Sequence, residues 1–241
     1  MRFGAILFWL IVWHLVSLFV DHEILIVSPV KVFQRIMQLA KELKFWKITG
    51  LSLLRITYGF FLGVFVGSAF AVVTVKSKIF YNLFYPLISV IKSTPVTSFI
   101  IMAFFWFRRT ENISPFIASL IVIPIIWGNV YEGIRNTDNN LLEMAKVMKV
   151  KRIKVLTKIY LPSVKPYLIA AFMASYGMAW KAGVAAEVIT HPKFAMGTQM
   201  HNAQIYLETK DLLAWTVVAV LISVVIERVL VNLLRGRRGK R

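Results

Sequence analysis

The chain of 241 residues has no cysteine, and this absence excludes a disulfide framework and any thiolate metal site. Its four histidines are scattered, without the His-Glu-x-x-His pattern or another metal-ligand spacing. The sequence also lacks a GxxxxGK[ST] phosphate loop and a serine in a GxSxG context. We therefore expect no resident cofactor, no enzymatic activity and no ATP hydrolysis by this chain alone.

Acidic residues are scarce as well, since 11 Asp and Glu stand against 29 Lys and Arg, for a formal net charge of +18. In a soluble protein this excess would suggest nucleic acid. Here, however, 58% of the residues are hydrophobic and the mean hydropathy is +0.69, values that favour an integral membrane protein. Anionic lipid and the positive-inside rule then explain the charge, and we expect no nucleic-acid partner.

Long apolar runs predict an all-α integral membrane protein with about six transmembrane helices in a single domain, residues 1–241. A spanning helix needs about 20 mostly apolar residues. The predicted spans are 3–20, 51–75, 79–107, 113–130, 164–190 and 212–234. If the N-terminus is inside, the cytoplasmic segments are the basic stretches 76–78 and 135–165 and the tail 235–241. Segments 21–50, 108–112 and 191–211 then lie outside.

Two stretches predict how helices lie against their surroundings. Residues 28–47 have apolar residues at helical spacing with lysines opposite, which predicts an extracytoplasmic surface helix with Ser28 as N-cap and Pro29 at its first position. In the second span Gly59, Gly63 and Gly67 recur every four residues. Such a stripe lets another helix approach closely, either within the subunit or across a dimer.

Four polar residues inside the predicted spans are hypothetical pathway or gate residues: Lys92, Thr94, Lys181 and Glu187. Lys92 stands beside Ser93-Thr94-Pro95, where a proline frees backbone groups that need protein or a wet cavity. Ionisable side chains in spans usually face the bundle interior. The alternatives are side chains that reach the interface or a structural ion pair, such as Lys92 with Glu187. The spacing of six argues against a direct Lys181–Glu187 pair.

Residues 141–162, LLEMAKVMKVKRIKVLTKIYLP, interrupt the apolar pattern with six basic residues and a single acidic one, Glu143. Asn140 followed three residues later by Glu143 resembles a capping box and predicts that a helix starts here. Pro162 and Pro166 are expected to break the chain before the fifth span. The pattern predicts a cytoplasmic helical hairpin over 137–162, which binds either anionic lipid head groups or a partner protein.

The order of residues in this segment resembles the EAA motif of the permease subunits of ATP-binding-cassette (ABC) importers. That motif reads EAA, three residues, Gly, nine residues, Ile-x-Leu-Pro, and the matching residues here are Glu143-Met144-Ala145, Lys149 and Ile159-Tyr160-Leu161-Pro162. The stretches SPVKV, LLRITYGFFLGVFVG, IKSTPVTSFIIMAFFWF and GMAWKAGVAAEV are similar to the nitrate/sulfonate/taurine-type branch. Lys149 replaces the usual Gly. Because a left-handed lysine costs about 1 kcal/mol, we expect this turn to be absent or differently made.

The resemblance implies a multi-pass permease subunit in a prokaryotic inner or plasma membrane. Two identical copies would form the pathway among membrane lipids, cytoplasmic ABC ATPase subunits would bind the ATP, and an extracytoplasmic binding protein would deliver the substrate. Residues implied to couple to the ATPase are Glu143, Ala145, Lys149, Ile159, Leu161 and Pro162. The implied substrate is a nitrate-, sulfonate- or taurine-like anion or a vitamin precursor. The rival interpretation is a stand-alone channel or lipid-binding membrane protein with a basic surface hairpin.

Overall fold

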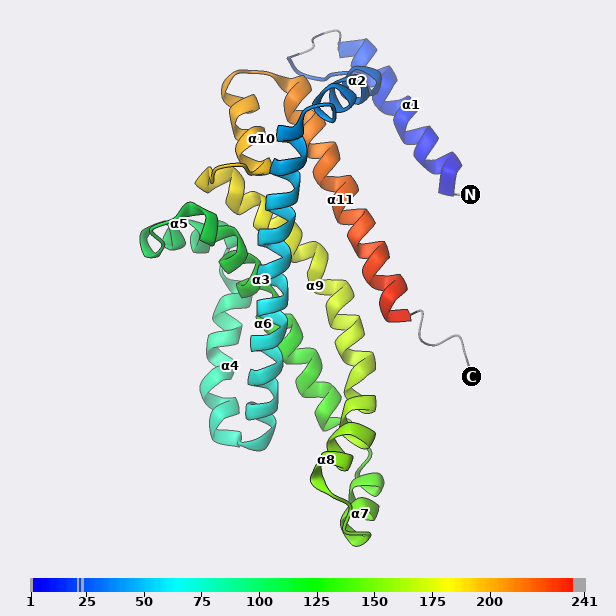
Figure 1. Ribbon diagram of the computed structural model, residues 1–241, viewed down its shortest axis with the longest axis vertical. Helices are drawn as coiled ribbons and strands as arrows, with labels where there is room; N and C mark the ends of the chain where they lie inside the picture. Colours follow the sequence, from blue (N-terminus) through cyan, green and yellow to red (C-terminus); the bar gives the residue numbers. More distant parts are fainter. Residues whose placement is uncertain (1, 21, 23, 236–241) are drawn as a thin grey trace.

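The computed structural model describes residues 2–20, 22 and 24–235, and this part of the chain is helical with no strand (Figure 1). The fold class predicted from the sequence is therefore confirmed. Short 3-10 and π turns, η1 (Thr110–Asn112) and η2 (Leu156–Tyr160), precede α6 and α9. The helices are α1 (Arg2–Val20), α2 (Pro29–Leu39), α3 (Leu43–Lys76), α4 (Lys78–Ser93), α5 (Val96–Trp106), α6 (Ile113–Arg135), α7 (Asn139–Val147), α8 (Arg152–Val155), α9 (Leu161–Thr190), α10 (Met196–Ile205) and α11 (Thr209–Arg235).

The centre of the bundle consists of α3, α6 and α9, which pack side by side (Figure 1). Phe60 of α3, Ile126 of α6 and Tyr176 of α9 are buried there, and the rings of Phe60 and Tyr176 meet edge to face at 5.1 Å between centroids. α4 packs beside α3 and α6, and α11 packs against α9 and α2. α7 and α8 project as the far end of the molecule (Figure 1).

The glycine stripe of α3 packs within the subunit, against α6, which settles the alternative left open by the sequence. A Cβ on Gly59 would lie 2.2 Å from the carbonyl oxygen of Pro115, and one on Gly63 would lie 2.7 Å from that of Ser119. Gly67 meets the carbonyl oxygen of Ile123 in the same way, at 2.8 Å. The absence of side chains therefore lets two parallel helices touch along their backbones.

Four helical segments are long and apolar enough to cross a membrane: Leu43–Lys76, Thr110–Arg135, Arg152–Thr190 and Thr209–Leu230. α4 and α5 meet the same test only as a pair, bent by 106°. Leu7–Val20 of α1 is a shorter apolar helix. By length and composition the described residues thus contain four spans, or five if the bent pair is one span, where the sequence predicted about six.

The largest departure from the predicted spans lies in 79–107, which we predicted as one interrupted span. The structure divides it at Thr94-Pro95 into α4 and α5, which make a broken or re-entrant element. Thr94 is extended, with φ −79° and ψ 133°, as expected for a residue that precedes a proline. Pro86, in contrast, lies inside α4 without ending it.

The predicted outer segments also differ from the structure. The surface helix expected over 28–47 ends at Leu39, and after a short turn the chain begins α3 at Leu43, well before the predicted start of the second span. Glu42 is extended at this turn, yet the apolar spacing continues across it and so hides the break. Ser28 holds the N-cap position of α2 without a side-chain bond, and Pro29 follows it as predicted. The expected outer loop 191–211 contains α10.

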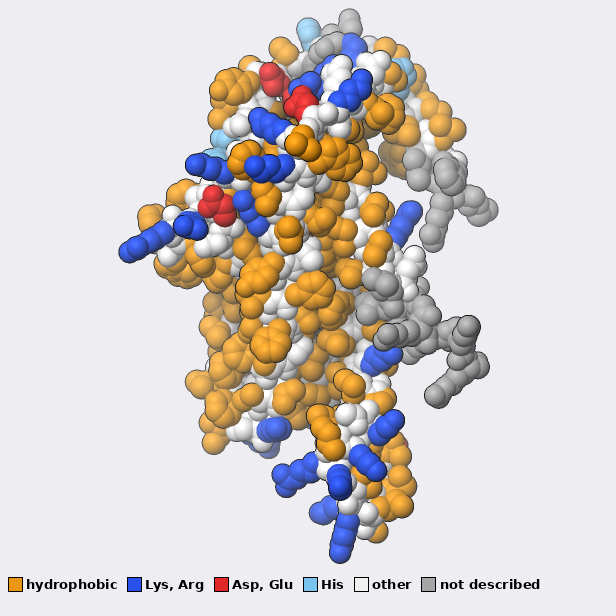
Figure 2. All heavy atoms as spheres, in the orientation of Figure 1, with side chains coloured by type: hydrophobic (Ala, Val, Ile, Leu, Met, Phe, Trp, Pro, Cys, Tyr) orange, Lys and Arg blue, Asp and Glu red, His pale blue; other side chains and the backbone are white. Residues whose placement is uncertain are grey.

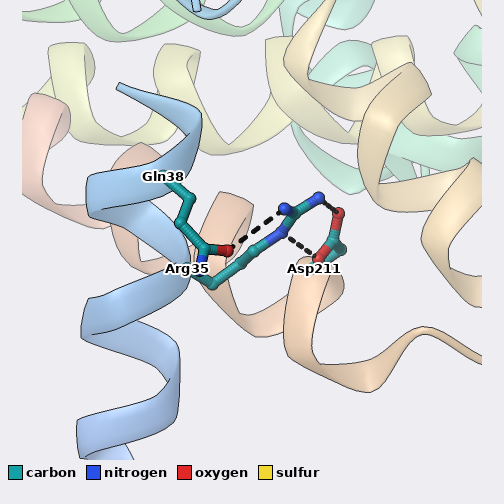
Figure 3. Close-up of polar contacts among 3 residues, drawn as sticks. All are labelled: Arg35, Gln38 and Asp211. Carbon is teal, nitrogen blue, oxygen red and sulfur yellow. Dashed lines mark hydrogen bonds and ion pairs between the residues drawn. The ribbon is translucent and has the colours of Figure 1, made fainter. Parts of the chain in front are cut away.

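A salt bridge joins α2 to the start of α11. Arg35 Nε and Nη2 donate to Asp211 Oδ1 and Oδ2 at 2.6 Å and 2.7 Å, while Arg35 Nη1 reaches Gln38 Oε1 at 3.4 Å (Figure 3). The carboxylate raises the pKa of Arg35 chiefly through these hydrogen bonds. Because a two-pronged guanidinium–carboxylate contact fixes both distance and orientation, it ties the surface helix to the bundle.

Charge is distributed unequally between the two ends of the molecule. On the face shown in Figure 2, Lys and Arg gather over the α7–α8 end without acidic neighbours, whereas the opposite end, over α2 and α10, carries both signs. By the positive-inside rule we expect the α7–α8 end to be cytoplasmic. The basic residues predicted for the tail beyond Arg235, namely Arg237, Arg238, Lys240 and Arg241, lie outside the described residues.

Candidate functional site

A cavity of about 530 Å³ lies where the break between α4 and α5 faces α6 and α9. Its walls are mainly apolar and include Pro124 of α6 and Met178 of α9. Three of the four hypothetical pathway residues, Lys92, Thr94 and Lys181, line this one cavity. Neither lysine forms an ion pair with a carboxylate in the part of the chain that the structure describes. Two cationic groups from separate helices thus face a shared apolar space.

The hydroxyl groups at the break bond back to the last turn of α4. Thr94 Oγ1 donates to the carbonyl oxygen of Val90 at 2.7 Å, and Ser93 Oγ donates to that of Ser89 at 3.0 Å. The Val90 carbonyl also accepts from the Thr94 amide at 3.0 Å, so the Thr94 hydroxyl adds a second hydrogen bond at the end of α4. Because the hydroxyl proton of Thr94 is donated to the Val90 carbonyl, Thr94 stabilises the break and does not donate a hydrogen bond into the cavity.

Glu187 does not lie at the cavity. It is fully buried at the junction of α3, α9 and α10, where its Oε2 accepts from Ser52 Oγ at 2.8 Å and from the Gly197 amide at 3.3 Å. Ser52 Oγ in turn accepts from the Met196 amide at 2.9 Å. The Lys92–Glu187 pair suggested as an alternative is therefore not formed.

The hydrogen bonds at Glu187 are confined to Oε2, because Oε1 is buried without a partner among the described residues. Its carboxylate and the Ser52 hydroxyl satisfy the first amides of α10, which have no partner within that helix. Gly197 is required for this contact, because a Cβ there would lie 2.5 Å from Glu187 Cβ. Ser52 was not predicted as a functional residue, although a polar residue in an apolar run is a sequence signal for one.

At the other end of the molecule, α7 begins at a different cap from the one predicted. The N-cap is Asp138, whose Oδ1 accepts from the Asn140 amide at 2.8 Å. The capping box expected between Asn140 and Glu143 is therefore wrong, because Asn140 is already inside the helix and Asp138 takes its role. Glu143 is left exposed on the second turn of α7.

The turn after α7 corrects the expectation that lysine would prevent a left-handed residue at position 149. Lys149 has φ 51°, and the chain makes the glycine-type helix end despite the side chain. The Val150 amide donates to the Ala145 carbonyl at 2.9 Å, and the Lys149 amide donates to that of Lys146 at 3.1 Å. This pair of bonds is the Schellman motif, whose hydrogen bonds offset a backbone cost of about 1 kcal/mol.

Beyond this turn the chain does not form a separate second arm of a hairpin. One helical segment runs from Arg152 to Thr190 through α8, η2 and α9. Pro162 does not break it, since the Leu161 amide bonds back to Leu156 as a π turn just before the proline. Of the residues implied to couple, Ile159 is partly buried, whereas Leu161 and Pro162 are exposed.

The far end of the molecule presents an apolar stripe to its surroundings. Leu141, Met144, Val147 and Met148 lie on α7 and its C-cap, and their exposed fractions are 42%, 52%, 82% and 69%. Ala145, in contrast, is buried on the inner side of the turn. Exposed apolar residues at three- and four-residue spacing on a short helix are typical of a helix that docks in a partner's groove.

Two curated permease proteins are similar to this chain in sequence. The nitrate import permease protein NrtB of Leptolyngbya laminosa is 26% identical over 146 residues, which are 61% of this chain and 52% of that protein. The bicarbonate transport system permease protein CmpB of Synechococcus elongatus is 23% identical over 145 residues, 60% of this chain and 52% of that protein. The chain thus spans about half the length of these curated relatives.

A solved structure and a family profile complete the comparison. A chain of the MetNI methionine ABC transporter in an inward-facing conformation superimposes on this chain with a TM-score of 0.61 at 14% sequence identity. The match covers 79% of this chain and 93% of that one, so the two chains share a fold. The profile of the family described as binding-protein-dependent transport system inner membrane component matches residues 59–239. The chain belongs to this family and is a multi-pass membrane protein.

Proposed function

We propose that this chain is the membrane-spanning permease subunit of an ABC importer and forms, with a second copy, the pathway for a small solute. The single observation that carries the proposal is the α7 end, where an exposed apolar stripe, the accessible Glu143 and the left-handed turn at Lys149 coincide with the EAA-like spacing. A groove on a cytoplasmic ATPase would receive this helix.

In this function α7 transmits the ATPase cycle to the spans. Closure of two ATPase subunits on ATP would move α7, and because the helical segment 152–190 is continuous from the turn to Thr190, the displacement would reach the cavity. Such switching requires that ATP and the loaded binding protein stabilise different conformations. In this proposal ATP hydrolysis takes place on the partner, and we expect none by this chain alone.

The substrate class proposed is a small anion of the nitrate, sulfonate or taurine kind, or else a vitamin precursor. Relatives named for nitrate and bicarbonate support the first of these. An extracytoplasmic binding protein would deliver the substrate to the outer end, formed by α2, α10 and the start of α11 (Figure 1).

Co-purification tests the proposed function. The chain is expressed with the ABC ATPase encoded beside it, extracted in mild detergent, and compared with Glu143→Lys. Glu132→Lys is the matched control, because it makes the same charge change at an exposed site near the end of α6. We expect association and ATP hydrolysis in wild type and control, and loss of either in Glu143→Lys. A folded wild type that binds anionic vesicles but no ATPase would contradict the proposal and favour the lipid-binding rival.

A further inference from the structure

The cavity between the α4–α5 break, α6 and α9 holds two positive charges and no negative one. Lys92 and Lys181 line it, and none of its lining residues is Asp or Glu. Charged side chains are costly within spans and persist there when they face a functional cavity or a partner. Among the described residues no carboxylate pairs with either lysine. The two charges are therefore unbalanced within the described residues, and an anion held in the cavity would balance them.

Glu187, the acidic member of the four hypothetical pathway residues, is not among the residues that line the cavity. In the structure its carboxylate is fully buried, and it accepts hydrogen bonds from Ser52 and Gly197 at a separate junction. It is therefore unable to neutralise the cavity by direct contact. The charged groups that line the space are therefore the two lysines, with no acidic residue among the lining residues.

The helix break adds to the positive potential of the two lysines. α5 begins at Val96, which lines the cavity, and the first amides of a helix have no acceptor within it. Broken spans in transporters present half-helix N-termini to anionic groups in this way.

From this geometry we infer that the permease itself carries a subsite for a small oxyanion, bound between Lys92 and Lys181. The inference rests on the proposed function, and deepens it by making the membrane subunit a second determinant of selectivity beside the binding protein. The volume of about 530 Å³ lies within the usual range for small-molecule sites. Its apolar walls, with Met178 and Pro124, suit nitrate or a short alkyl sulfonate better than a strongly hydrated dianion.

The absence of cysteine makes a direct test possible. A single cysteine is introduced at Met178, in the cavity wall, and its modification rates by a sulfonate-bearing and by a trimethylammonium-bearing methanethiosulfonate reagent are compared in the purified full chain. Asn202→Cys, exposed on α10, is the matched control for intrinsic reactivity and salt screening. Neither an ATPase nor a binding protein is present, so failure here is distinguishable from failure of the importer assignment.

We expect the anionic reagent to be favoured at Met178→Cys by about tenfold or more relative to the control cysteine, since two unit charges lie near the reacting group. Adding Lys92→Gln or Lys181→Gln should remove most of this preference, and Lys181→Arg should keep it because the charge remains. Nitrate and methanesulfonate should slow modification at Met178→Cys more than at Asn202→Cys. Equal rates for both reagents, a preference that survives both Gln variants, or no protection by either anion would overturn the inference.

Discussion

Gly59→Ala provides the sharpest test of how α3 and α6 are packed. The added methyl group would lie 2.2 Å from the Pro115 carbonyl oxygen and 2.6 Å from Pro115 Cα, whereas ordinary contacts begin at 3.4 Å. The obstacle is backbone, so the two helices must separate by about 1 Å, an overpacking that costs about 1–3 kcal/mol or more. Alanine regains about 1 kcal/mol of helix propensity. The difference is a net loss of up to about 2 kcal/mol in the free energy of unfolding.

The same helix offers a matched control. Gly50 of α3 has nothing within 4 Å of an added Cβ, so Gly50→Ala should gain about 0.5–1 kcal/mol from propensity alone. Both variants are compared with wild type by thermal unfolding and by SDS titration of the detergent-solubilised protein. If Gly59→Ala proves as stable as Gly50→Ala, the close contact between α3 and α6 is wrong.

Three further predictions concern the ends of the bundle. Lys149→Gly should raise the free energy of unfolding by about 1 kcal/mol, because glycine adopts the left-handed conformation freely; unchanged stability in SDS titration would speak against that turn. Arg35→Ala should lose about 1–3 kcal/mol through its two charge-assisted bonds to Asp211, and Arg35→Lys should recover less than half because it lacks the planar fork; equal melting temperatures for all three proteins would refute this. At the outer end the His191 and His201 rings lie 3.7 Å apart, and desolvation, then the His201 charge, lowers the pKa of His191 below 6.5. The neutral form is thus favoured on folding, so stability is full above about pH 6.5 and falls as the pH drops toward the folded-state pKa. When the pH is lowered from about 7.5 to about 5.5, the His191→Gln protein should lose less stability than wild type. An equal fall in melting temperature for the two proteins would contradict the lowered pKa of His191.

The fold class and the polar pathway residues were accessible to sequence reasoning because both depend on local chemistry. Apolar runs predict helices, and a lysine within such a run is conspicuous. Lys92, Thr94 and Lys181 were selected on that basis and lie on one cavity; their role stays a proposal. The glycine spacing likewise indicated close packing, but its partner, Pro115 to Ile123 of α6, depends on tertiary structure.

The features that sequence reasoning missed depend on partners distant in the chain or on a balance of small energies. Glu187 was placed with the pathway, although Ser52 and Gly197 hold it elsewhere. Pro95 indicated a break, but the 106° bend depends on how α5 packs against α6 and α9. At Lys149 the residue type argued against a turn that the spacing favoured, and the hydrogen bonds of the turn outweigh the cost of the side chain.

The central claim is that α7 is the contact through which a cytoplasmic ATPase acts on this chain. Because the chain has no native cysteine, Val147→Cys, 82% exposed on α7, can be cross-linked to single cysteines in the groove of the co-expressed ATPase. Ile79→Cys, 79% exposed at the start of α4 near the same end of the molecule, is the control. We predict a cross-link at Val147→Cys whose yield changes on addition of ATP, and none at Ile79→Cys. An assembled complex that shows no cross-link at Val147→Cys, or equal cross-links at both positions irrespective of ATP, would contradict the account.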